Sequence, residues 1–408
     1  MGAFTTGLRT AAFPLMLGAA FAAPAFADVV TDWNARAEAL AVEKRLLPPP
    51  NARGMAILHV AMFEAVNAIE RRYTPYKLTL NGDPSLSKEA AAAAAAHAVL
   101  VALHPDQLAP LDAALKASVA AVPDGDAKTK AIELGKTAAR EILAWRAKDN
   151  ANAAETYRPA TKPGVYIATI IPVSSTYGGT TPWTMEKGSQ FRPAPPPELD
   201  SATWTSDLNE IRELGARNSA KRTEEQTTIG RFWFVTGPQA WNPIVRQLVA
   251  AKKLDVVDGA RLFALTAMAG DDALIAVFDA KYHYNFWRPV TAIRNADATG
   301  NTATPRDGSW LPLGDTPMHP EYPCAHCITA TAVGTVLQKV LGNEIPEVSM
   351  TSATAPGVVR KWTSVQDYME EVSLARVYAG FHYRFSATIG EEMGRKIGEQ
   401  AVASKLTR

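Results

Sequence analysis

The stretch Lys281-Tyr-His-Tyr-Asn-Phe-Trp-Arg288-Pro289 places a lysine and an arginine seven residues apart among aromatic side chains. On a helix, residues seven apart lie two turns from each other, so the sequence predicts that Lys281 and Arg288 point from one helix face. Two fixed cations in an aromatic setting suit a multiply charged oxyanion better than they suit solvent. Pro289 is expected to end or kink the helix just past the arginine.

A second stretch, Pro320-Glu-Tyr-Pro323-Cys324-Ala325-His326-Cys327, predicts a helix start that carries a histidine. Pro323 is expected in the first turn of a helix over 323–341. The unpaired backbone N–H groups of that turn form an anion site, beside which His326 can act as an acid or a base. Taken alone, the pattern is better explained by a helix with a buried histidine.

A third stretch, Ala375-Arg376-Val-Tyr-Ala-Gly380-Phe381-His382, brings a further arginine and a further histidine. Six residues of an ideal helix turn through about 600°, so Arg376 and His382 share a face only after a distortion. Gly380 is the natural place for that distortion.

In this order, Lys-x6-Arg-Pro, Pro-x-x-His and Arg-x5-His resemble the motifs of one superfamily. It unites type 2 phosphatidic acid phosphatases, bacterial non-specific acid phosphatases and vanadium-dependent haloperoxidases. The motifs span 281–382, about a quarter of the chain, and the helical run-up and proline-rich middle look similar to the soluble bacterial haloperoxidase-like group. The resemblance implies an all-α fold of helical bundles of the vanadium haloperoxidase and acid phosphatase type.

The resemblance also implies a role for each motif residue. Three cations would hold the equatorial oxygens of phosphate or vanadate: Lys281, Arg288 and Arg376. His326 would be the acid or base on the apical side. His382 would be the nucleophile that forms a phosphohistidine or, if vanadate is bound, the axial ligand to vanadium. Phosphoryl transfer and vanadate binding share a trigonal-bipyramidal centre that such cations can clamp.

The chain departs from the family pattern directly before His326, where the family usually has Ser-Gly and this sequence has Cys324-Ala325. Ala325 keeps its backbone N–H as an oxyanion donor, whereas Cys324 replaces a hydroxyl donor with a weak thiol. A thiol beside bound peroxide is oxidised readily, which argues against haloperoxidase turnover. Alternatively, Cys324 and Cys327 form a disulfide that removes the exposed thiol. The sequence leaves both states open.

The leading functional prediction is an exported enzyme that oxidises halide with peroxide and uses vanadate as its cofactor. The alternative is a phosphatase that hydrolyses phosphate esters through a phosphohistidine and needs no cofactor. A non-catalytic phosphate-binding relative is a minor alternative, against which His326 and His382 argue because binding alone requires neither. A thiol redox protein built on Cys324 and Cys327 would need a strand-rich setting that the sequence lacks.

Other side chains near the motifs have two possible roles each. The aromatic residues of the first stretch are expected to line the approach to the site, with two or more in the core: Tyr282, Tyr284, Phe286 and Trp287. His283 either faces the pocket or makes a structural hydrogen bond, and the second is favoured. Asp279 either orients a site residue or, more simply, is a surface acid.

Composition and the N-terminus predict a soluble exported protein with a small-molecule substrate. A net charge of +1 with mixed signs gives no reason to expect nucleic acid or an anionic membrane as a partner. Arg9, the apolar run 11–23 and Ala25-Phe26-Ala27 predict a signal peptide over 1–27, cleaved near Ala27, and hence a periplasmic or secreted product. No other segment offers a clean span of about 20 apolar residues, so no integral membrane segment is expected. The oligomeric state is not predicted.

The mature chain divides into an N-terminal helical part over 28–149, a proline-rich loop over 150–200 and a C-terminal helical part over 201–408 that carries the oxyanion site. We expect 28–408 to form one compact unit. The seven alanines of 90–96 predict tight helix packing. A long apolar helix over 258–280 is expected to break or kink near Gly270. The proline-rich loop either reaches the site through Trp183 and 190–193 or is a structural strap.

The remaining helices are expected over 32–45, 53–71, 105–121, 126–148, 204–217, from 223, 363–380 and 386–403. No alternating β pattern persists. Three histidines on the N-terminal helices are interpreted as packed or capping residues: His59, His97 and His104.

Overall fold

The computed structural model describes residues 29–168 and 170–408, and within them it is mostly helical, as predicted. The predicted signal peptide over 1–27 lies outside the described residues. The α-helices are α1 (Val29–Glu43), α2 (Pro48–Glu70), α3 (Lys88–Leu103), α4 (Leu108–Ser118), α5 (Asp126–Arg146), α6 (Ala202–Leu214), α7 (Glu224–Phe232), α8 (Asn242–Ala251), α9 (Val256–Tyr284), α10 (Pro289–Arg294), α11 (Ala325–Leu341), α12 (Val365–Tyr378) and α13 (Arg384–Ser404). The strands are β1 (Glu344–Ser352) and β2 (Ala355–Ser364).

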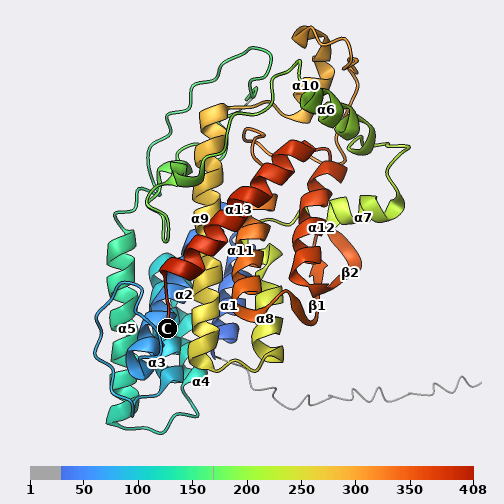
Figure 1. The fold of residues 1–408 in the computed structure, drawn as a ribbon. Coiled ribbons are helices and arrows are strands. Elements are labelled where there is room, and N and C mark those ends of the chain that lie inside the picture. Colours follow the sequence, from blue (N-terminus) through green and yellow to red (C-terminus); the bar gives the residue numbers. More distant parts are fainter. Residues whose placement is uncertain (1–28, 169) are drawn as a thin grey trace, which may run out of the picture.

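The long helix α9 runs through the centre of the molecule, with α2 on one side and α11 and α13 on another (Figure 1). It begins where the Asp255 carboxylate accepts hydrogen bonds from the backbone N–H groups of Val257 and Asp258. The kink expected near Gly270 is wrong, because α9 is continuous over 29 residues. A Cβ at this glycine would lie 2.8 Å from the Trp241 ring, so Gly270 makes room for the indole.

The N-terminal helices α2, α3 and α5 pack together beside the first half of α9. Ser87 starts α3 by accepting a hydrogen bond from the Ala90 N–H at 3.1 Å. All seven alanines from 90 to 96 are fully buried, and a Cβ at Gly135 of α5 would lie 2.2 Å from the Ala91 carbonyl oxygen. The alanine run therefore permits close helix approach, as predicted. Helix α2 is long and apolar enough to cross a membrane, but it is a core helix here.

The C-terminal helices bring the second and third motifs together. Helix α13 presents Gly390, Gly394 and Gly398 to α11, and a Cβ at any of them would lie 2.5 to 2.8 Å from a carbonyl oxygen of α11 or its cap. The two backbones are therefore nearly in contact. This packing fixes the first turn of α11, which carries His326, against the start of α13, which follows His382.

The sequence did not predict the antiparallel hairpin of β1 and β2. Its buried residues in β1 are Ile345, Val348, Met350 and Ser352, so the spacing changes from odd to even along the strand. The register shifts between Glu344 and Val348, which is the mark of a bulge. Because the bulge breaks the alternation, the strand does not show the period of two by which strands are recognised.

The segment 150–200, called the strap below, runs over α9 (Figure 1). Two buried carboxylates and one half-buried carboxylate of α9 hold it. The Trp183 indole N–H donates to Asp271 at 2.7 Å, and the Trp183 backbone N–H donates to Asp272 at 2.7 Å. Arg192 makes two 2.8 Å hydrogen bonds to Asp279. Trp183 and Arg192 therefore have the structural role that was one of the two expectations: they fasten the loop to α9. Asp279 is the partner that holds Arg192. The division into 28–149, 150–200 and 201–408 stays a prediction.

Candidate active site

The first motif lies on two helices and not on one. Helix α9 ends at Tyr284, because Asn285 adopts a left-handed conformation with φ 49°. Arg288 is the N-cap of the next helix, which begins at Pro289. The expectation that one helix face presents both Lys281 and Arg288 is therefore wrong, as is the expectation that Pro289 ends a helix. Proline suits a helix start because its missing N–H would have no partner there.

The two cations nevertheless converge on the segment that precedes the second motif. The Lys281 ammonium donates to the carbonyl oxygens of Pro320 and Glu321 at 3.0 and 2.6 Å. The Arg288 guanidinium donates to the carbonyl oxygens of His319 and Phe381, both at 2.9 Å. Both side chains are buried, so the backbone holds their charged ends at one place.

The third motif contains the distortion that its spacing required. Gly380 has φ +78° and ends α12, and the N–H groups of Phe381 and His382 both donate to the Arg376 carbonyl oxygen, at 3.1 and 3.3 Å. This turn brings the side chains of Arg376 and His382 to the same cavity. Arg376 donates to the Trp233 carbonyl oxygen at 2.6 Å, while its buried Nε has no hydrogen-bond partner among the described residues.

The second motif starts α11 two residues later than expected. The helix begins at Ala325 with Cys324 as its N-cap, so Pro323 precedes the helix and is not in its first turn. His326 lies in the first turn, with Nε2 3.0 Å from the Val235 carbonyl oxygen. Because a carbonyl only accepts, neutral His326 carries its proton on Nε2 and keeps a lone pair on Nδ1.

Cys324 and Cys327 form a disulfide in the structure. Both are fully buried, and Cys324 Sγ accepts a hydrogen bond from the Cys327 N–H at 3.1 Å. The described residues that line the cavity include Ala325 and His326 but neither cysteine. No thiol therefore stands where the family usually has a serine hydroxyl.

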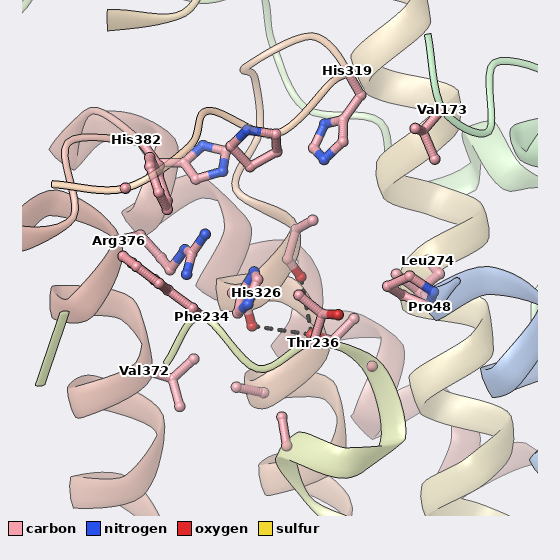
Figure 2. A pocket seen from close by; sticks show the side chains of 18 of the residues that line it. Pro48, Val173, Phe234, Thr236, Leu274, His319, His326, Val372, Arg376 and His382 are labelled. Carbon is pink, nitrogen blue, oxygen red and sulfur yellow. Dashed lines mark hydrogen bonds between the residues drawn. The ribbon is translucent and has the colours of Figure 1, made fainter. Parts of the chain in front are cut away.

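Residues of the second and third motifs line a cavity of about 590 Å³. In Figure 2, His326, Arg376 and His382 lie toward one side, Pro48, Leu274 and Val173 lie toward the other, and His319 lies at the top between the two groups. Lys281 and Arg288 do not line the cavity, but the Lys281 ammonium binds the carbonyl oxygens next to His319, which does, and Arg288 Nη1 lies 3.2 Å from His382 Nε2. The side chains of the second and third motifs thus line one cavity, and Arg288 of the first motif contacts His382 from outside that lining.

Glu321 is a site residue that sequence analysis missed. Its Oε1 lies 2.8 Å from His382 Nδ1 and accepts the Tyr383 N–H at 3.1 Å. Because the Arg288 guanidinium can only donate, His382 Nε2 is the acceptor and Nδ1–H donates to Glu321. Burial raises the pKa of Glu321 to about 7, against the lowering effect of Lys281 and Arg288. Its position inside the second motif was the only signal in the sequence.

His319 was also missed. Its Nδ1 lies 3.0 Å from Arg288 Nη2, and its ring lines the cavity. Burial, followed by the charge of Arg288, lowers the pKa of this imidazole well below its usual range. The sequence signal was a third histidine seven residues before His326. That histidine lies in the segment 295–320, whose many glycine, proline and aspartate residues indicate a loop and do not suggest a site.

The buried side chains at and beside the cavity carry more positive than negative charge. Burial lowers the pKa of Lys281 well below its usual range, that of Arg288 to about 10 and that of Arg376 to about 9. Glu321 is the one carboxylate whose charge raises the pKa of Lys281 or Arg288, and the pKa of Arg376 responds only to burial and to Arg288. Three buried cations thus face one carboxyl group, and an anion in the cavity would offset their desolvation.

Burial also lowers the pKa of His326 and of His382 well below the usual range, with the neighbouring cations adding to the effect. Both imidazoles are therefore neutral near pH 7. A neutral His382 offers its Nε2 lone pair, and a neutral His326 is able to accept a proton.

The other candidates lie away from the cavity. The aromatic residues of the first motif do not line it, and Phe286 and Trp287 pack in a buried cluster with Trp204. The expectation that they line the approach is wrong, whereas the expectation that two or more lie in the core is confirmed by Phe286 and Trp287. These two follow the end of α9 at Tyr284, and the chain turns them into this cluster. His283 is exposed. The three N-terminal histidines have structural partners, as expected: His59 with Asn34, His97 with Asp112, and His104 at the end of α3.

The family model "VCPO second helical-bundle domain" matches residues 261–407. The vanadium chloroperoxidase of Curvularia inaequalis is 26% identical over 286 residues, which cover 53% of this chain. That match spans 46% of the chloroperoxidase, a little under half of its length.

Two solved structures share the fold. The first bacterial vanadium-dependent iodoperoxidase superposes with a TM-score of 0.82 and 24% identity, covering 93% of this chain and 97% of the iodoperoxidase. The holo form of a bacterial vanadium-dependent chloroperoxidase gives a TM-score of 0.70 and 17% identity, covering 87% and 92%. The family-model match and the sequence match, together with this common fold, support the vanadium haloperoxidase superfamily for this chain.

Proposed function

We propose that this chain is a vanadate-dependent haloperoxidase that oxidises halide with hydrogen peroxide. The observation that supports this most is the set of three buried cations at and beside one cavity, with a single carboxyl group among their described neighbours. An uncompensated buried charge costs several kcal/mol, on the order of the penalty for breaking a buried ion pair. A multiply charged oxyanion in the cavity removes that cost.

The residues present fit vanadate. Lys281, Arg288 and Arg376 would hold its oxygens, and the unpartnered Nε of Arg376 is a spare buried donor for one of them. His382 Nε2 would bind the vanadium, since Nδ1 is bound to Glu321. When bound, vanadate supplies a Lewis-acid centre that activates peroxide toward halide.

His326 is proposed to move the proton that peroxide must lose. Its Nε2–H is held by the Val235 carbonyl oxygen, which leaves Nδ1 free to accept. The Ala325 backbone N–H, at the start of α11, is the proposed further donor to the oxyanion. Substitution of the usual glycine by alanine leaves that N–H in place.

The disulfide favours the peroxidase over the phosphatase. A free thiol at Cys324 would be oxidised by peroxide, and this argued against haloperoxidase turnover. With Cys324 bonded to Cys327, the side chain no longer offers that thiol. Peroxide, the oxidising substrate, then finds no free thiol at this position to oxidise.

The alternative is a phosphatase that hydrolyses phosphate esters through a phosphohistidine. One observation favours it: the carboxyl of Glu321 holds His382 Nδ1 and leaves the lone pair on Nε2, beside Arg288, which is the arrangement that a nucleophilic histidine needs. The two activities share every residue named above, so only an assay separates them.

The test compares iodide oxidation, with vanadate and peroxide, against hydrolysis of 4-nitrophenyl phosphate without vanadate. We expect iodide oxidation, and we expect His382→Ala to lower it by at least about 100-fold, the lower end of what a positioned catalytic group contributes. His283→Ala removes an exposed histidine close by in the sequence and should leave the rate unchanged. Full activity of His382→Ala would refute the assignment, and phosphatase activity without iodide oxidation would select the alternative.

We also propose that the protein is exported. The disulfide fits an oxidising compartment, and the segment 1–27 has the charge, apolar run and small residues of a signal peptide. N-terminal sequencing of protein from the periplasmic fraction should begin at Asp28. Protein that keeps Met1 and remains in the cytoplasm would contradict this.

A further inference from the structure

The position of each sulfur atom decides what the product of halide oxidation can modify in this chain. Hypohalous acid, the two-electron oxidation product of a halide, attacks soft nucleophiles, and thiol and thioether sulfur are the softest in proteins. Cys324 and Cys327 are bonded to each other, fully buried and outside the lining of the cavity. They offer the oxidant no thiol, so the thioethers remain.

The methionines of the described residues differ sharply in exposure. Met318 is 48% exposed and lines the cavity. The others are at most 7% exposed and do not line it: Met55, Met62, Met185, Met268, Met350, Met369 and Met393. Within the described part of the chain, the one accessible thioether therefore lies at the cavity into which the oxidant would be released.

Met318 is connected to the oxyanion site through its neighbour in the chain. His319 Nδ1 lies 3.0 Å from Arg288 Nη2, and Arg288 Nη1 lies 3.2 Å from His382 Nε2. The Met318 carbonyl oxygen accepts the Val173 N–H at 2.8 Å, which fixes the backbone of Met318 against the strap. Figure 2 shows His319 and Val173 at the top of the cavity. A thioether held there meets oxidant from the site before that oxidant is diluted in solvent.

We propose that Met318 is a self-modification site, at which hypohalous acid made at the oxyanion site oxidises the chain that made it; this inference rests on the proposed function. The sulfur atom gains one oxygen and loses two electrons, and the halogen takes up these electrons and leaves as halide. One thioether and one hypohalous acid give one sulfoxide, one halide ion and one proton. The sulfoxide turns an apolar side chain at the cavity into a polar one, and methionine sulfoxide reductases reverse the change.

The test compares Met318 with a methionine of equal exposure outside the cavity. Leu108→Met provides it, because Leu108 is also 48% exposed, lies at the start of α4 and does not line the cavity. The vanadate-loaded variant oxidises iodide or bromide with peroxide, while free methionine in large excess consumes oxidant that reaches solvent. Peptide mass spectrometry then measures the sulfoxide at both positions. Val359→Met, at a 56% exposed position of β2, serves if Leu108→Met does not fold.

The measured quantity is the ratio of sulfoxide at Met318 to sulfoxide at the introduced methionine. Reagent hypobromous acid, added from solution without free methionine, gives the reference ratio that exposure alone produces. During turnover we expect a ratio larger by about tenfold or more, because the oxidant is released beside Met318. Treatment with a methionine sulfoxide reductase should return Met318 to its unmodified mass.

A turnover ratio equal to the reagent ratio would show that exposure alone selects Met318, and the proposal would fall. The same conclusion follows if Met318 is oxidised equally without halide, or undiminished in His382→Ala, because neither sample makes hypohalous acid at the site. Sulfoxide that accumulates on the free methionine, and depends on halide, reports halide oxidation in the same sample. Its absence would refute the proposed function, on which this inference rests. Its presence beside an unmodified Met318 would refute the self-modification alone.

Discussion

Glu321 and His382 form a buried pair in which the carboxyl group decides which imidazole nitrogen faces the cavity. The two side chains are 0% and 1% exposed, and 2.8 Å separates Oε1 from Nδ1. Arg288, which only donates, lies 3.2 Å from Nε2 on the other side of the ring. Both neighbours therefore require the tautomer in which Nε2 keeps a lone pair. That lone pair is what an axial ligand or a nucleophile must present.

We expect Glu321→Gln to lower His382-dependent activity by about 10- to 100-fold at pH 8, the usual effect of removing the partner of a ligating histidine. Burial raises the pKa of Glu321 to about 7, so in the folded protein the carboxyl is protonated below that pH and ionised above it. As the pH rises from 6 to 8, the carboxylate forms and strengthens its hold on Nδ1–H. The wild-type rate should therefore rise over this range, and the rise should be absent in Glu321→Gln.

The measurement is the pH profile of kcat/KM for both proteins. Glu347→Gln removes an exposed glutamate of the hairpin that pairs with Lys361, and its profile should match that of the wild type. A Glu321→Gln profile that keeps the rise between pH 6 and 8 would show that another group causes it.

The site could be predicted only where its residues are close in sequence. Lys281 and Arg288 lie seven apart, and Arg376 and His382 lie six apart, so their motifs are readable and carry the family resemblance. Glu321 acts on a residue 61 positions away, and His319 acts on Arg288 across 31 positions. Residues that are so far apart in the sequence form no short motif that could be recognised. The state of Cys324 also depended on geometry, because two cysteines three apart are compatible with either state.

At the scale of elements, the turn after α12 is the feature on which the site depends most. Gly380 has φ +78°, and a Cβ there would lie 2.5 Å from the Gly215 carbonyl oxygen and 3.0 Å from the Trp310 ring. A side chain would thus be strained by the backbone conformation and would also collide with its surroundings. The same turn sets the distance between Arg376 and His382.

We expect Gly380→Ala to lower the free energy of unfolding by about 2 to 4 kcal/mol, because a left-handed residue costs about 1 to 3 kcal/mol and the collision adds to it. It should also abolish activity under conditions where the variant is still folded, because His382 is displaced. Gly300→Ala is the matched control: Gly300 has φ +74° with open space around its Cβ position. Denaturant unfolding and iodide oxidation check both variants. Equal losses in the two would mean that the close packing at Gly380 has no consequence.

Helices were predicted well where the apolar face or the capping residue lies within the helix or directly before it. Helix α3, with the cap Ser87 and its run of alanines, is an example. The errors have physical causes beyond the reach of local patterns. The residue that ends α9 is Asn285, whose left-handed conformation is one that asparagine tolerates but does not require. Gly270 does not kink the helix. Its missing side chain leaves room for the ring of Trp241, which lies 29 residues earlier in the chain. The hairpin was missed because its bulge hides the alternation.

For the molecule as a whole, α9 connects the parts that the site needs. Its first half packs against α2 in the N-terminal core, its middle holds the strap through Asp271 and Asp272, and its end carries Lys281. The N-terminal helices reach the cavity only through Pro48 and Pro49 at the start of α2. We infer that these helices mainly support α9, while the loops and helices from Phe234 onward form the oxyanion site.

The central claim is that the three buried cations and His382 bind a single oxyanion in this cavity. The most direct test is a crystal structure of the protein soaked with vanadate, compared with one of Arg376→Ala treated in the same way. We predict density for one vanadate in the wild type, with vanadium bonded to His382 Nε2 and oxygens facing Lys281, Arg288 and Arg376, and weak or no density in the variant. A cavity without vanadate, or vanadate bound elsewhere on the chain and unaffected by Arg376→Ala, would contradict the account.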